Sequence, residues 1–214
     1  MKNQFTELLK IPKLPFYIAL ALFSAGLALA SRQLLVTETL YYNTFGEQLS
    51  VERIDQMLET GKKWEWLGYA FLPLAVLIRA GFTCVCMYVG RLLSVSSRAS
   101  FGDCFNIALK ADAVFVLMAF CNLIYFTFAG VDTLTDLSAS PFSLLFLFKN
   151  DMPADYLAYP LGLINLFEVL YWLLLSAMAA SVFKKNFSKG FEFVAGTYGV
   201  GLLLWALLII LLIM

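Results

Sequence analysis

Long apolar runs constrain this chain more than any other feature of its sequence. A helix needs about 20 apolar residues to cross a hydrocarbon layer roughly 30 Å thick. Five stretches come close to or exceed that length, and they are approximately residues 14–30, 67–89, 108–129, 157–183 and 191–214. We therefore predict an all-α polytopic membrane protein, in which residues 1–214 form a single integral membrane domain with five transmembrane helices.

The composition agrees with lipid as the main solvent. Apolar residues make up 61% of the chain and charged residues 14%, which is about half the charge density of an ordinary soluble domain. Basic residues do not alternate with aromatic ones in any block, so we expect no nucleic-acid partner. The main partners that we expect are membrane lipids, with another membrane protein or a second copy of the chain as a further candidate.

Side chains that carry enzyme chemistry are scarce. There is no histidine, which removes the commonest general base and the usual metal ligand. The four cysteines lie in or beside apolar runs and are interpreted as small packing residues. Signatures for nucleotide binding, zinc hydrolysis or a serine nucleophile are not found. We predict a protein that is not an enzyme and has no cofactor and no metal.

The distribution of Lys and Arg predicts the orientation. Basic residues lie in the N-terminal tail, in the loop after the second run and in the turn after the fourth, which contains Lys184, Lys185 and Lys189. Most acidic residues lie in the other two loops. Because Lys and Arg favour cytoplasmic loops, we place the N-terminus in the cytoplasm and the C-terminus outside.

Two segments outside the long runs also have helical signals. Residues 50–61 have an N-cap serine, Ser50, apolar residues at helical spacing and a closing glycine, Gly61. They predict an external amphipathic helix on the membrane surface, with a lid or a partner-docking element as the alternative. In the third loop, Ser140 and Pro141 predict the start of a short helix over residues 141–150, at the outer interface or dipping partway into the bilayer.

Two charges fall near the middle of predicted transmembrane helices. At about 1.5 Å per residue, Arg79 lies roughly 18 Å below the outer end of the second run and Glu168 roughly 16 Å below that of the fourth. A lone charge at that depth is costly, so such residues face the bundle interior and find a partner. We predict that Arg79 and Glu168 pair with each other.

Other polar residues share the inner faces of these helices. Asn165 lies on the same stripe as Glu168, and Asp112 and Asn122 mark a stripe on the third run. Asp112 is nearer the cytoplasmic end, where Lys110 or Arg91 is the expected partner. One hypothesis makes Arg79, Glu168, Asn165, Asn122 and Asp112 an intramembrane polar site for an anion or a proton. The alternative is that one ion pair only holds two helices in register.

Small residues recur four apart in the last run. Ala195 precedes Gly199, and Thr197 precedes Gly201, by one helical turn. Such pairs let helices approach closely in membranes. They predict a tight contact between the last helix and the rest of the bundle.

Residues 90–205 resemble the Yip-domain family, five-span proteins that include the Ypt/Rab-interacting proteins. The resemblance rests on four short stretches: residues 90–93 (GRLL) after the second run, 100–108 (SFGDCFNIA) before the third, 170–175 (LYWLLL), and 186–190 (NFSKG) before the last. It implies a five-helix membrane fold.

The N-terminal tail distinguishes the chain from eukaryotic members of that family. It has about 13 residues and lacks their acidic motif with tyrosine and glycine. The third run also lacks the proline of many members. The resemblance therefore implies a bacterial-type member in the cytoplasmic membrane, without Rab binding.

Two functions follow from these observations. The first is a non-enzymatic accessory or organising protein that acts through partners or lipids in the bilayer. The alternative is a small transporter or permease subunit whose midplane site contains Arg79 and Glu168.

Overall fold

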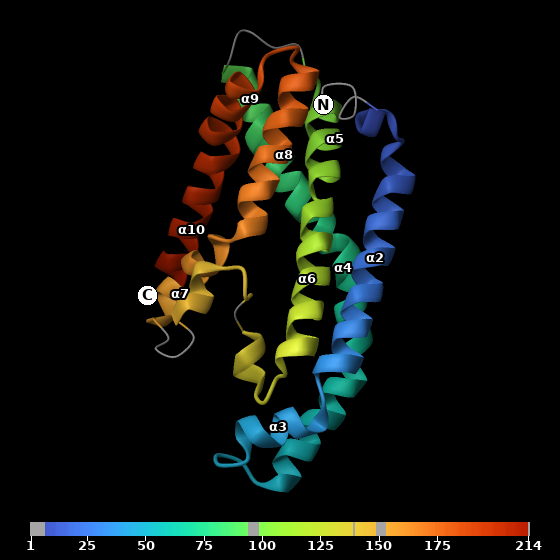
Figure 1. The fold of residues 1–214 in the computed structure, drawn as a ribbon, viewed down its shortest axis with the longest axis vertical. Coiled ribbons are helices and arrows are strands. Elements are labelled where there is room, and N and C mark those ends of the chain that lie inside the picture. Colours follow the sequence, from blue (N-terminus) through green and yellow to red (C-terminus); the bar gives the residue numbers. More distant parts are fainter. Residues whose placement is uncertain (1–6, 94–98, 139, 149–152, 214) are drawn as a thin grey trace.

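The computed structural model describes residues 7–93, 99–138, 140–148 and 153–213 (Figure 1). Within these ranges the structure is helical, and extended backbone pairs only at the isolated bridge between Ser143 and Asn165. The helices are α2 (Lys13–Leu35), α3 (Glu38–Phe45), α4 (Val51–Leu93), α5 (Phe101–Ala111), α6 (Ala113–Ala129), α7 (Asp155–Leu163), α8 (Leu166–Val182), α9 (Phe187–Val194) and α10 (Val200–Ile213). Two short 3₁₀ helices, η1 (Leu134–Leu137) and η2 (Leu144–Phe148), and one π-helical turn, η3 (Ala195–Gly199), complete the set.

Four helical segments of the described chain are long and apolar enough to cross a membrane. They are Lys13–Leu35, Val51–Leu93, Phe101–Ala129 and Phe187–Ile213. They include nearly all of the first, second, third and fifth predicted runs. The protein is therefore an all-helical membrane protein, as the apolar runs predict.

The fourth predicted run does not form one helix. Its residues divide into α7 and α8, and α8, with 17 residues, is shorter than the other four segments. Asn165 interrupts the helix because its Oδ1 accepts a hydrogen bond from the Glu168 amide at 2.8 Å and so caps α8. The freed backbone is satisfied by a neighbouring loop, since the Leu144 amide donates to the Ile164 carbonyl at 2.9 Å. The prediction of a continuous helix over 157–183 is wrong.

The segment after the first crossing also differs from its prediction. Residue 61 does not end a helix, because it lies inside α4, which has 43 residues and ends at Leu93. The separate amphipathic helix predicted over 50–61 is therefore absent from the described structure. The short α3 lies against this end of α4, where Tyr42 donates a hydrogen bond to the Asp55 carboxylate and Lys62 pairs with Glu38.

These two contacts change the pKa values of Tyr42 and Lys62. The hydrogen bond to Asp55 is the main cause that raises the pKa of Tyr42. The hydrogen bond to Glu38, together with its negative charge, raises the pKa of Lys62.

The third loop is folded differently from its prediction as well. Residues 141 and 142 form a turn, and a 3₁₀ helix begins only at Leu144. The Ser143 amide donates to the Ser140 carbonyl at 3.0 Å. The predicted helix over 141–150 is thus replaced by a turn and η2, and its last two residues lie outside the described ranges.

Several glycines leave no room for a side chain between neighbouring helices. A Cβ atom at Gly190 of α9 would collide with the backbone carbonyl oxygen of Ser176 in α8. At Gly199 it would lie 2.5 Å from the indole ring of Trp172, and at Gly201 it would meet the Cys86 sulfur of α4. The predicted tight contact of the last helix is confirmed at these two positions.

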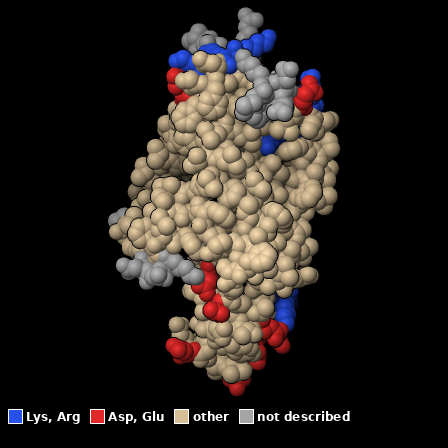
Figure 2. Space-filling view, in the orientation of Figure 1, with Lys and Arg blue, Asp and Glu red and all other residues tan. Residues whose placement is uncertain are grey.

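Charges separate toward the two ends of the molecule. Figure 2 shows Lys and Arg gathered at the end that holds the N-terminal segment, and Asp and Glu mainly at the end of α3. The surface between them is formed by uncharged residues over most of its height. A belt of this kind fits a hydrocarbon layer with water on both sides.

The contact at Gly190 gives a test of the packing. We expect Gly190→Ala to lower the free energy of unfolding by about 1–3 kcal/mol, because the new methyl group meets backbone that no rotamer change can move. The matched control is Gly196→Ala, where no atom lies within 4 Å of the new Cβ. Unfolding in mild detergent measures both, and equal stability of the two variants would contradict the contact.

Candidate functional site

A bidentate ion pair joins α4 to the junction of α5 and α6. Arg79 Nε lies 2.6 Å from Asp112 Oδ1, and Arg79 Nη2 lies 2.7 Å from Asp112 Oδ2. The Asp112 side chain is fully buried, whereas the Arg79 side chain is 39% exposed. Its guanidinium also stacks over the Phe115 ring, 4.0 Å from the centroid. The fork geometry fixes the direction of the arginine and neutralises a carboxylate that water cannot reach.

This arrangement corrects two sequence predictions. Among the described residues, Arg79 pairs with Asp112 and not with Glu168, so the partner of Asp112 is Arg79 in place of the expected Lys110 or Arg91. Asp112 lies at the turn that joins α5 to α6, with helical backbone dihedrals, and its carboxylate faces α4. Glu168 lies in the first turn of α8 rather than halfway along a crossing helix.

Lys110 is instead used to hold the N-terminal segment. Its side chain is buried, and its ammonium donates to the carbonyl oxygens of Leu8 at 2.6 Å and Ile11 at 2.8 Å. Asn106, one turn earlier in α5, donates to the Leu9 carbonyl at 3.0 Å. Three carbonyl groups of one short segment are thereby bound to α5.

Glu168 is held by neutral donors. Its Oε1 accepts hydrogen bonds from Trp172 Nε1 at 3.0 Å and from the Tyr198 hydroxyl at 2.8 Å. The N-terminal end of α8 adds the favourable end of a helix dipole. Within the described chain, no Lys or Arg lies within ion-pair distance of this carboxylate.

The π-helical turn η3 presents Tyr198 to this carboxylate. A π turn inserts an extra residue into a helix and changes the direction of the side chains beside it, often at functional sites. Tyr198 also packs edge-on against Tyr171, whose hydroxyl lies 2.9 Å from the Thr83 hydroxyl of α4. Tyr198 and Tyr171 therefore connect Glu168 to Thr83 of α4.

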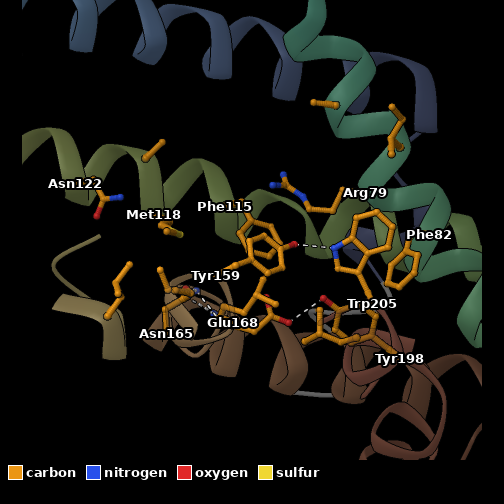
Figure 3. A pocket seen from close by; sticks show the side chains of 18 of the residues that line it. Arg79, Phe82, Phe115, Met118, Asn122, Tyr159, Asn165, Glu168, Tyr198 and Trp205 are labelled. Atoms are coloured by element: carbon orange, nitrogen blue, oxygen red, sulfur yellow. Dashed lines mark hydrogen bonds between the residues drawn. The ribbon is translucent and has the colours of Figure 1, made fainter. Parts of the chain in front are cut away.

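A pocket of about 1030 Å³ opens beside these groups (Figure 3). Its walls come from α4, α6, α7, α8, η3 and α10. The predicted site residues Arg79, Asn122, Asn165 and Glu168 all line it, and Asp112 lies behind Arg79. The structure thus brings together the residues that the helical stripes indicated, with Arg79 paired to Asp112 and the other three on the wall of the same pocket.

Sequence reasoning missed the aromatic part of the pocket. Tyr198, Tyr159 and Trp205 line it, and the Trp205 indole donates to the Tyr159 hydroxyl at 2.7 Å between α10 and α7. Tyr198 lies in the small-residue stretch of the last run, which was a usable signal. The pair formed by Tyr159 and Trp205 depends on the packing of α7 against α10. No pattern in the sequence indicated that these two residues would meet.

The described residues contain no group of three or more His, Cys, Asp or Glu side chains that could hold a metal ion. Comparison with protein-family models, with curated proteins and with solved structures finds no match for this chain. Interpretation of the site therefore depends on its geometry.

The ion pair makes an asymmetric prediction. Arg79→Met should lower the free energy of unfolding by about 3–5 kcal/mol, because it leaves the buried Asp112 carboxylate without a partner. Asp112→Leu should cost less, since Arg79 can turn toward the pocket. The double variant should regain most of the loss.

Unfolding in mild detergent, analysed as a double-mutant cycle, measures this coupling. Lys62→Met is the control, because its pair with Glu38 is solvent-exposed, and we expect almost no change. Additive losses in the double variant would show that the pair is not coupled.

Lys110 makes a local prediction. Lys110→Met removes the donor to Leu8 and Ile11, so backbone amides near residues 7–11 should exchange hydrogen faster while those of α5 and α8 stay protected. Hydrogen exchange followed by mass spectrometry gives the readout, with the exposed Lys189→Met as the control. Unchanged exchange in that segment would rule out the anchoring role.

Proposed function

We propose that this chain is a non-enzymatic integral membrane protein that binds an amphiphilic, lipid-like molecule in its central pocket. The observation that carries the proposal is the pocket itself. Its volume is at the upper end of the range for small-molecule sites, and its walls are largely apolar with a few polar groups. A molecule with a hydrocarbon chain and a polar head has the matching chemistry.

The pocket has polar groups at more than one level. Arg79 and Glu168 belong to α4 and to the start of α8, while Asn122 of α6 accepts a hydrogen bond from the Ser140 hydroxyl at 3.0 Å. The apolar part of the wall includes Ile78 and Met118. One end of a ligand could be hydrogen-bonded while its chain lies against hydrocarbon.

The proposal includes a membrane arrangement. We infer five crossings, in which α8 with the preceding α7 forms an interrupted fourth crossing. The N-terminus is in the cytoplasm and the C-terminus outside, in a bacterial cytoplasmic membrane. The basic end of the molecule supports this orientation, because Lys and Arg favour the cytoplasmic side.

The family remains part of the proposal. The stretches within residues 90–205 that resemble Yip-domain proteins support a bacterial-type member of that family, which acts as an accessory or organising component through lipids, another membrane protein or a second copy. Exposed apolar side chains on α2 and α10, such as Phe23 and Leu211, support extensive contact with lipid.

A permease subunit is the second candidate. It is favoured by one observation, that the pocket reaches Glu168 at the interrupted helix. Interrupted helices bind substrates at the midplane of several transporter folds. Uptake of a solute by proteoliposomes that contain the purified chain would favour this candidate, whereas retention of a bound amphiphile without transport favours the first.

Filling the pocket tests the proposed binding. Ala119 of α6 lines the pocket, so Ala119→Trp should reduce the bound amphiphile at least tenfold by occupying its space. Leu117→Trp is the matched control on the same helix, because Leu117 is exposed and does not line the pocket. Native mass spectrometry after mild solubilisation, and titration with decanol, measure occupancy. Equal binding by both variants would refute the pocket as the site.

A further inference from the structure

We propose that the pocket selects an organic cation: an alkylammonium head lies against Glu168 while its hydrocarbon chain follows the apolar wall. This inference rests on the proposed function and specifies the chemical class of the ligand.

The charged residues that line the pocket favour a cationic ligand over an anionic one. Arg79 is already committed to Asp112 through two hydrogen bonds, and together these residues are neutral. Glu168 is the other charged residue among the described residues that line the pocket. When Glu168 is ionised, the described site thus carries one net negative charge, which a monovalent cation would neutralise.

One oxygen of Glu168 remains available. Oε1 accepts from Trp172 and Tyr198, whereas Oε2 has no hydrogen bond in the described structure. Among the described residues, Asn106 Oδ1 is the fully buried side-chain oxygen or nitrogen without a partner, so Oε2 is not sealed off. The carboxylate lines the pocket and can therefore meet a ligand there.

Aromatic rings lie next to this carboxylate. Phe82, Tyr198 and Trp205 line the pocket, and Phe82 lies 6.3 Å from the Tyr198 ring and 6.0 Å from the Trp205 ring between centroids. The plane of the Phe82 ring is inclined by 73° to the Tyr198 ring and by 59° to the Trp205 ring. Figure 3 shows Phe82, Tyr198 and Trp205 close together on one side of the pocket. Aromatic walls of this kind attract alkylammonium groups through cation–π interactions.

An anionic head is a poorer match. It would have to bind Arg79, whose charge the buried Asp112 already neutralises, and it would lie in the same pocket as the Glu168 carboxylate. Like charges in a medium of low dielectric repel strongly. The geometry therefore favours the cation over an anion of the same chain length.

Three probes with the same ten-carbon chain test the charge preference: decyltrimethylammonium, decanol and decanoate. The full chain is purified in a maltoside detergent, and binding is followed by isothermal titration calorimetry. Ala119→Trp gives the background from partition into micelles. We expect the cation to bind at least tenfold more tightly than decanol, and decanoate to bind more weakly than decanol.

Glu168→Gln is the decisive variant. The amide keeps a carbonyl oxygen for Trp172 and Tyr198, so the local hydrogen bonds can persist without the charge. The affinity of the Glu168→Gln variant for decyltrimethylammonium should fall to its affinity for decanol. Glu192→Gln, at an exposed acid of α9 that pairs with Lys189, is the matched control and should bind like the wild type.

The outcomes separate the two proposals. If the three probes bind equally and Ala119→Trp abolishes their binding, the pocket binds amphiphiles but the preference for a cation is wrong. Tighter binding of decanoate, lost in Arg79→Lys, would replace the cation by an anion. If none of the probes binds above the Ala119→Trp background, the proposed amphiphile site itself fails. Comparing the three probes on the wild type, each corrected by its Ala119→Trp background, needs no change at Glu168 and decides the charge preference even if Glu168→Gln does not fold.

Discussion

The ion pair between Arg79 and Asp112 is the interaction on which the interior of this bundle depends. A carboxylate with no exposed surface needs a cation in fixed geometry, and the arginine fork supplies two hydrogen bonds to it. Asp112 lies where α5 ends and α6 begins, so one side chain of α4 organises the middle of the third crossing. The position of Phe115 under the guanidinium follows from the same contact. Arg79 thus belongs both to the framework and to the pocket wall.

A second constraint is that backbone groups in lipid need partners. The interruption between α7 and α8 is tolerated because the segment around Ser143 lies alongside Asn165 and exchanges hydrogen bonds with the residues that flank it. The interruption places Glu168 in the first turn of a helix, where the end of α8 and two neutral donors stabilise negative charge. A continuous helix would leave this carboxylate dependent on a cation within the bundle. The break therefore separates Glu168 from Arg79 and leaves space between them.

Apolar length and helical stripes predict the crossings and the residues that face the interior. Arg79, Asn122, Asn165 and Glu168 are recognisable because polar groups in lipid must turn inward, and the structure places all four on one pocket. The partners of the charges were not predictable, since the position of Glu168 depends on the break between α7 and α8, which the hydropathy pattern hides. Asn165 is flanked by apolar residues on both sides, so its preference for a helix cap is masked. Gly61 failed as a stop signal because α4 continues through it, whereas Gly199 and Gly201 do mark close contacts.

The length of α4 has a mechanical consequence. Its 43 residues extend about 65 Å at 1.5 Å per residue, roughly twice the thickness of the hydrocarbon layer. The part that carries α3 must project beyond the bilayer as a rigid lever. Pro73 lies between this lever and Arg79, and its carbonyl oxygen accepts a hydrogen bond from the Tyr17 hydroxyl at 3.1 Å. A proline in a helix interior removes one backbone hydrogen bond and makes a natural bending point. The same continuous helix therefore connects the end of the molecule that carries α3 to Arg79, with the contact between α2 and α4 at Pro73 between them.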